Sequence, residues 1–208
     1  MFSKMRFPIA ATACALAASL ACASSAQAYA AQASVSRYID YWSNSGWYVG
    51  DYSNDAGPSC GLGTEDRIEG RNPLITFIFM GPNTPFMVFQ NSDWSITDGE
   101  HYPGMAIGFF DQNNQITSNY AGTDFIGGKE SRLVVKIGDD FYDHVSRNRT
   151  MTAFRTVADN EPVVVGHVDL RGSSEAVGKL RECYQKASER HQSAIERERS
   201  HPKDPFAR

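Results

Sequence analysis

The sequence is poor in the motifs that mark common enzymes and metal sites. It contains no H-x-x-x-H, H-E-x-x-H or C-x-x-C spacing, which the usual zinc and redox sites require. It also lacks the G-x-S-x-G of serine hydrolases. Its Gly-Gly-Lys run at 127–129 is followed by Glu130, where a phosphate-binding loop needs a hydroxyl. These absences predict a protein without a metal ion, a cofactor or an enzymatic activity.

Excess positive charge is also missing. The chain has 20 Lys and Arg against 24 Asp and Glu, a formal net charge of −4. Proteins that bind nucleic acid or anionic lipid through bulk charge are basic, so we expect no nucleic-acid partner. Beyond residue 28, no apolar run reaches the length of a membrane span, which predicts that the chain has none.

The first 28 residues have the pattern of a secretory signal peptide. Lys4 and Arg6 supply the positive start, residues 7–22 are apolar but too short for a good membrane span, and Ala26-Gln27-Ala28 is a small-residue cleavage site. We therefore predict a protein located in the periplasm or secreted. The remaining residues, 29–208, carry a net charge of −6, because Lys4 and Arg6 are the charged residues of the removed segment.

Cysteine is scarce as well. Of the four cysteines, Cys14 and Cys22 lie in the signal segment, so Cys60 and Cys183 remain. Export places this pair in an oxidising compartment, where a disulfide is the expected state. In the chain-entropy model, a bridge closing so long a loop stabilises the fold by roughly 4–5 kcal/mol.

Short apolar segments separated by turn residues dominate the rest of the chain. In the N-terminal segment 29–46, Val35, Tyr38, Ile39 and Trp42 have helical spacing and predict a short helix. From Trp47 onward the pattern alternates or is continuously apolar, with a hairpin expected between 74–80 and 86–90. The strands predicted are 47–52, 60–64, 74–80, 86–90, 94–97, 105–110, 115–120, 131–137, 141–146, 150–157 and 163–170. This spacing predicts a mainly β fold, an antiparallel β-sandwich or a partly open barrel.

A helix is expected at the C-terminal end of this β-rich domain, which we place at residues 47–188. Ser173 or Ser174 would cap it, and Val177, Leu180, Tyr184 and Ala187 would form one apolar face. Cys183 lies on the same face, so the predicted disulfide would dock the helix on the second strand. Residues 189–208 are charged and predict a disordered tail.

Aromatic and arginine residues are the candidate binding groups. Trp42, Trp47 and Trp94, with several tyrosines, would form either a binding surface or part of the core. Arg147 and Arg149 flank Asn148 in a tight turn and would suit an anion or the acidic patch of a partner.

The order of elements resembles a known family. The residues that carry the likeness are Gly46-Trp47-Tyr48-Val49 at the first strand, the early Cys60, and LRGSSEAVGKL at 170–180, a strand, a glycine turn and a short helix. They resemble the small exported proteins of the proteobacterial invasion-associated locus B family. The resemblance implies a non-enzymatic periplasmic or secreted protein that acts in the bacterial envelope or toward a host, and it assigns no catalytic residue.

Three functions stay open at this point. The first is an exported protein that binds an envelope or host protein, without catalysis. The second is a carrier of a small apolar ligand or a glycan, with a barrel pocket lined by residues 74–90 and the aromatics. The third is an envelope hydrolase that uses His167 and Asp169, which lie two apart on one face of a predicted strand, or His101 with a carboxylate.

Overall fold

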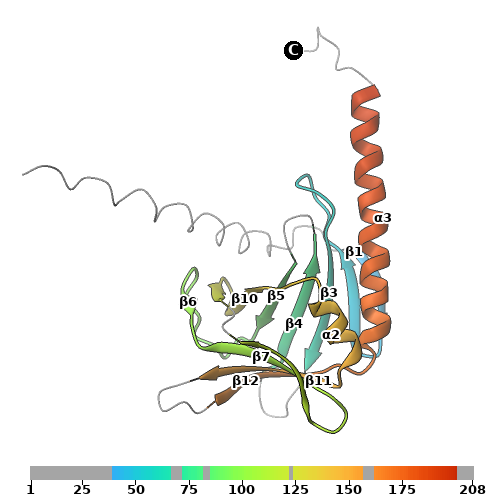
Figure 1. The fold of residues 1–208 in the computed structure, drawn as a ribbon. Coiled ribbons are helices and arrows are strands. Elements are labelled where there is room, and N and C mark those ends of the chain that lie inside the picture. The colour runs from blue at the N-terminus through green and yellow to red at the C-terminus, as the bar shows by residue number, and fades with distance from the viewer. Residues whose placement is uncertain (1–38, 67–71, 82–84, 122–123, 157–161, 201–208) are drawn as a thin grey trace, which may run out of the picture.

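The computed structural model describes residues 39–66, 72–81, 85–121, 124–156 and 162–200. The predicted signal peptide, residues 29–38 and residues 201–208 lie outside these ranges. Within them, twelve strands form two antiparallel sheets accompanied by two helices (Figure 1). The predicted mainly β class with a C-terminal helix docked on the sheet is confirmed, and among these residues neither sheet closes into a barrel.

The larger sheet has eight strands. In chain order they are β1 (Ile39–Asn44), β2 (Trp47–Asp51), β3 (Cys60–Asp66), β4 (Leu74–Met80), β5 (Phe86–Gln90), β6 (His101–Tyr102), β9 (Phe125–Gly128) and β10 (Arg132–Lys136). Their order across the sheet is β1-β2-β3-β4-β5-β10-β9-β6, so β1 and β6 are the edge strands.

The smaller sheet has four strands and lies across the larger one (Figure 1). Its members are β7 (Met105–Phe110), β8 (Ile116–Ala121), β11 (Thr150–Thr156) and β12 (Pro162–Asp169), in the order β12-β11-β7-β8. The helix α2 (Phe141–Arg147) leads from the larger sheet into β11, and α3 (Ser173–Ser200) follows β12.

The core explains why the apolar run at 74–80 is continuous. Ile78 of β4 points into the main core between the sheets, where it is fully buried with Phe89, Ile107 and Leu180. Phe79, the next residue, points to the other face and packs in a second buried cluster with Phe86, Val88 and Val134. The predicted hairpin between β4 and β5 is confirmed, with Phe79 opposite Phe86.

The predicted disulfide is present. Cys60 at the start of β3 and Cys183 in α3 are both buried and bonded, with Cα atoms 6.2 Å apart and 123 residues between them. The helix face predicted to dock does so: Val177, Leu180 and Ala187 are buried with Cys183. The predicted capping residues Ser173 and Ser174 both lie inside α3, and the Ser173 hydroxyl donates to the carbonyl of Val145 at 2.6 Å.

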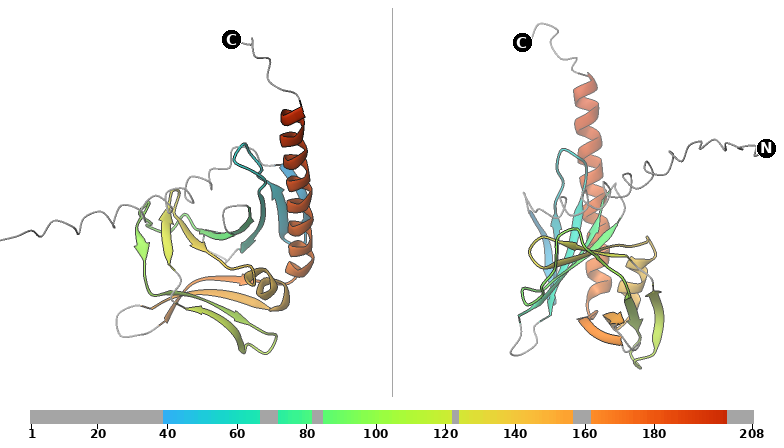
Figure 2. Two further views of the ribbon diagram at one scale, coloured as in Figure 1. Left: turned by 45° about the horizontal axis from the view of Figure 1, so that its top comes forward. Right: turned by 90° about the vertical axis from the view of Figure 1, so that its left-hand side faces the viewer.

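The tail prediction is wrong for residues 189–200, which continue α3 and project past the ends of the strands (Figures 1 and 2). These residues lack an apolar stripe, but they are mostly good helix formers. Side-chain pairs four residues apart support them, as Gln192 to Glu196 at 3.0 Å shows. Arg190 also reaches back to the buried carboxylate of Asp51 and anchors the middle of the helix.

The short helix predicted near the N-terminus is wrong where the structure describes it. Residues 39–44 form the edge strand β1, paired with β2. Ser45 and Gly46 connect them with φ of 53° and 81°, the two positive values of a tight hairpin turn. The helical spacing of Ile39 and Trp42 misled because a bulge between Asp40 and Trp42 interrupts the strand alternation.

Two other predicted strands are wrong. Residues 141–147 form α2, where Phe141 and Val145, four apart, are buried on one side. Their β-branched and aromatic content is typical of a strand. In a helix, however, Phe141 and Val145 lie on the same side and both reach the core. Residues 94–97 form no strand, because Trp94 is instead held by a turn bond from its N–H to the carbonyl of Asn91.

The sequence pattern also missed β6 and β9, which fall in segments rich in turn residues. In β9, Gly127 is needed because another segment of backbone packs closely against it, rather than because the chain turns there. A Cβ on Gly127 would lie 2.0 Å from the carbonyl oxygen of Thr97, so another residue would push the two segments apart. Glycine at a close backbone approach has the same sequence appearance as glycine in a loop.

The disulfide gives the first testable prediction. Cys60→Ser should lower the free energy of unfolding by about 2–5 kcal/mol, because the open chain gains conformational freedom when unfolded. Urea unfolding of the wild type and the variant, each with and without reductant, measures this difference. The variant should not respond to reductant. A wild type equally stable in both conditions would contradict the assignment of a stabilising role to the bridge.

A second contact joins α3 to the edge strand β1. Glu182 accepts hydrogen bonds from Lys179 at 2.9 Å and Lys186 at 2.8 Å, and the Lys186 ammonium lies 5.4 Å from the ring centre of Tyr41. Hydrogen bonds from Lys186, Lys179 and Tyr41 lower the pKa of the Glu182 carboxyl from 4.5 to about 2.

This lowered pKa predicts a pH dependence. The carboxylate stabilises the folded state above its ordinary pKa, and this contribution disappears as the pH falls from 4.5 toward about 2. Wild type should therefore have a higher Tm than Glu182→Gln at neutral pH, and the gap should close on acidification. Glu198→Gln, at an exposed position farther along α3, is the control. A gap that stays constant with pH would argue against this ion cluster.

Candidate functional site

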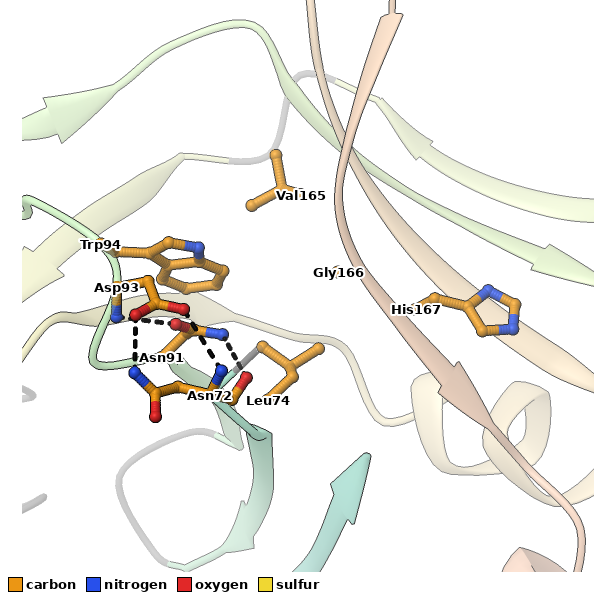
Figure 3. Close-up of a pocket in the computed structure, with 8 residues that line it drawn as sticks. All are labelled: Asn72, Leu74, Asn91, Asp93, Trp94, Val165, Gly166 and His167. Carbon is orange, nitrogen blue, oxygen red and sulfur yellow. Dashed lines mark hydrogen bonds between the residues drawn. The ribbon is translucent and has the colours of Figure 1, made fainter. Parts of the chain in front are cut away.

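A cleft lies between the two sheets, at the point where β12 approaches the ends of β4 and β5 (Figure 3). Its volume is about 280 Å³. One side is formed by the segments around β4 and β5, namely Asn72, Leu74, Asn91, Asp93 and Trp94, and the other by residues 165–167 of β12. The cleft therefore combines an indole ring, two amides, one carboxylate and aliphatic side chains.

Trp94 is fixed in place by its backbone. Its N–H donates to the carbonyl of Asn91 at 3.1 Å, and its carbonyl accepts from the hydroxyl of Ser131 at 2.8 Å. The side chain is half-buried and packs against the main core. The indole therefore presents a surface to the cleft without needing to become ordered when a ligand binds.

Below the indole, three polar side chains form a network (Figure 3). The Asp93 carboxylate accepts from the side-chain amide of Asn72 at 2.6 Å and from its backbone N–H at 3.3 Å. The Asn91 amide donates to the carbonyl of Asn72 at 3.2 Å and accepts from the N–H of Asp93 at 2.8 Å. The network ties the start of β4 to the end of β5 and holds its groups in fixed positions.

The sequence interpretation missed this network. Asn91-Ser92-Asp93 has the composition of a turn and forms one. Asn72 lies before a proline in a segment expected to be a loop. Nothing in the local pattern shows that these two turns meet, because their contact depends on the pairing of β4 with β5.

The wall of the cleft formed by β12 lies close to β4 because Gly166 has no side chain. A Cβ on Gly166 of β12 would lie 2.7 Å from Cδ2 of Leu74, so the strand lies directly against β4 here. Val165 faces the indole across the cleft, and the imidazole of His167 lies farther away (Figure 3). The two walls belong to different sheets, so the width of the cleft depends on how the sheets are held together.

The three tryptophans do not form one surface. Trp42 lies half-buried on β1, and Trp47 on β2 is 3% exposed, with its indole N–H donating to the carbonyl of Arg171 at 2.8 Å. Only Trp94 lines the cleft. Trp47 thus has a structural position in the core, one of the two uses expected for the aromatics.

Arg147 and Arg149 are both at the turn that leads from α2 into β11. Arg147 lies 3.8 Å from Asp143, and Arg149 lies 3.8 Å from Asp169. Each of these aspartates also pairs with a second arginine, Arg181 or Arg171 respectively. The predicted arginine pair is therefore divided between two ion clusters, each made of one aspartate and two arginines.

The side chains of His167 and Asp169 have separate partners. His167 bonds to the Thr152 hydroxyl at 3.1 Å, and Asp169 accepts from Arg171 at 2.6 Å instead of from the imidazole. Burial raises the pKa of the Asp169 carboxyl, but its bonds from Arg171 outweigh burial and lower it overall. His101 does pair with a carboxylate, Asp124, at 2.9 Å, but both side chains are mostly exposed.

The carrier hypothesis expects a pocket lined by residues 74–90, of which the structure describes 74–81 and 85–90. Side chains from this segment, Ile78, Met87 and Phe89 among them, are fully buried and pack in the core. Leu74, the first residue of this segment, lines a small open cleft at the rim.

Neither described helix combines the length and apolar character of a membrane span. In the described ranges, no three His, Cys, Asp or Glu side chains come together as a metal site would need. No protein family, curated protein or solved structure matches this chain.

The polar network predicts a defined effect of mutation. Asp93→Ala removes the acceptor of two Asn72 hydrogen bonds, so the free energy of unfolding should fall by about 1 kcal/mol. Tryptophan emission should also shift to longer wavelength as the loop loosens around Trp94. Asp98→Ala, at an exposed turn position in the same loop, is the matched control. Equal effects of the two substitutions would show that the network does not hold the loop.

Proposed function

We propose that this is an exported protein of the bacterial envelope or the secreted fraction that binds another protein and has no enzymatic activity. The predicted signal segment and the disulfide support export, because a bridged pair suits an oxidising compartment. The resemblance to the invasion-associated locus B family supports the same assignment. The tightly packed core favours binding through the surface over carriage of an apolar ligand in the interior.

The observation that carries this proposal is where the apolar surface lies. The large hydrophobic side chains exposed among the described residues are Ile39, Ile116, Val163 and Val164. They lie on β1, β8 and β12, which are edge strands of the two sheets. Proteins usually protect such edges with charge, proline or bulges, since an open apolar edge pairs with other chains. In β12 these features are Pro162 and a bulge at Val165, and the exposed Val163 and Val164 lie between them.

Among these edges, β12 suits a protein partner best. It has eight residues, and consecutive Val163 and Val164 are 49% and 57% exposed. In the described residues it pairs with β11 alone, which leaves backbone N–H and C=O groups on its outer side. An extended peptide added there would gain main-chain hydrogen bonds and contacts to the valines.

Charge indicates the kind of partner. Residues 29–208 carry a net charge of −6, so two copies of the chain repel each other at long range. A partner with basic residues flanking an extended aliphatic segment would be attracted instead. The proposal is therefore a protein partner of opposite charge, with an envelope or host protein as its source.

The experiment compares the wild type with Val164→Lys. Both proteins are immobilised in the oxidised form and exposed to envelope extract, and bound proteins are quantified by mass spectrometry. A lysine on the open edge should weaken capture of the true partner about tenfold, because it places a charge in the new strand pair. At so exposed a position it should change stability by less than about 0.5 kcal/mol.

Ile39→Lys on the edge strand β1 is the matched control and should keep capture. The purified partner should then slow amide hydrogen exchange in residues 162–169 of the wild type. Capture that Val164→Lys does not reduce, or binding without protection of β12, would contradict the proposal.

A further inference from the structure

We propose that the Trp94 cleft binds one ring of a neutral saccharide. This goes beyond the protein-binding role and does not depend on it, because neither exposed valine of β12 lines the cleft, although the next residue, Val165, does. The argument rests on the size of the cleft, the fixed indole and the mixture of hydrogen-bonding groups beside it.

The volume of the cleft limits the guest to a small ring. Pockets for drug-sized ligands usually span roughly 300–1,000 Å³. At about 280 Å³ this cleft lies just below that range. A single sugar ring with its hydroxyl groups fits such a space, whereas a lipid chain or a folded peptide does not. The cleft opens to solvent, so further rings of an oligosaccharide would extend outward.

The apolar walls suit the C–H face of a sugar. The electron-rich face of an indole attracts the weakly positive C–H groups of a sugar ring. Leu74 and Val165 contribute aliphatic contacts on either side. The backbone bonds to Asn91 and Ser131, together with packing of the half-buried indole against the main core, reduce the entropic cost of ordering Trp94 on binding.

The polar groups near the indole offer both donors and acceptors. The indole N–H of Trp94 donates no hydrogen bond within the described residues, and the Asn91 amide has a second hydrogen beyond the one given to Asn72. Each oxygen of Asp93 accepts one hydrogen bond and keeps further accepting capacity. A hydroxyl group both donates and accepts, so vicinal hydroxyls match this mixture.

Charged ligands match the donors and acceptors of the cleft less well than a neutral ligand does. No lysine or arginine lines the cleft, and the His167 imidazole on the β12 wall bonds to the Thr152 hydroxyl, so an anion would meet Asp93 without a permanently charged cation to balance it. An ammonium or guanidinium group only donates, so it could use the remaining accepting capacity of Asp93 but no other part of this mixture of donors and acceptors. The Trp94 and Asn91 donors would then face a group that accepts nothing. This pattern favours a neutral polyol over either ion.

Saturation-transfer NMR on the purified, oxidised protein tests the proposal. The probes are triacetylchitotriose and cellotriose at millimolar concentration, with an arginine-containing tripeptide as the cationic comparison. Saturation should reach the ring protons of one sugar residue in at least one saccharide probe, and the tripeptide should receive none. Trp94→Ala should weaken saccharide binding about tenfold by removing the stacking surface.

Two further variants make the result decisive. Trp94→Phe keeps an aromatic ring in the core contact and should weaken binding by a smaller factor with an unchanged circular dichroism spectrum. Trp42→Ala on β1 removes a half-buried tryptophan elsewhere and should leave binding unchanged. Val164→Lys should bind the saccharide normally, which separates this test from that of the edge strand. Absence of transfer to both saccharides, transfer to the tripeptide alone, or binding that the Trp94 variants leave intact would overturn the proposal.

Discussion

The bond between Cys60 and Cys183 is the constraint on which the arrangement of the molecule depends. It joins the third strand of the larger sheet to α3, and α3 follows β12 of the smaller sheet after a short turn. The bridge therefore links the two sheets covalently through one helix. Trp47, whose indole donates to the carbonyl of Arg171, fixes the start of the helix, and Arg190 on Asp51 fixes it two turns beyond the bridge.

The geometry of both candidate surfaces, the Trp94 cleft and the edge of β12, depends on this link. The walls of the Trp94 cleft come from different sheets, with Leu74 of one against Gly166 of the other. The open edge of β12 lies on the strand that leads into α3, so its position follows the helix (Figure 2). A rigid scaffold with binding groups at its rim and edges is what a durable protein outside the cytoplasm needs.

Sequence periodicity was informative wherever burial decides local structure. The β4 run, the hairpin to β5, the apolar face of α3 and the cysteine pair were all predictable, because each leaves a local or compositional mark. Residues 39–44 and 141–147 were assigned the wrong element, since a bulge at Tyr41 and the core contacts of Phe141 are tertiary effects. The cleft could not be predicted from the sequence for the same reason, because Asn72 and Asp93 come into contact only after β4 and β5 pair. The sequence marked Trp94 as a candidate, but could not distinguish it from the buried Trp47.

Amide hydrogen exchange of the oxidised and reduced protein, followed by mass spectrometry, tests most directly whether the bridge holds the two sheets together. The account predicts that reduction increases exchange along α3 from Ser173 to Ala187, in β12, and in the loop that carries Trp94, because all three depend on the same link. An increase confined to the residues next to Cys60 and Cys183, with β12 and the Trp94 loop unchanged, would contradict it.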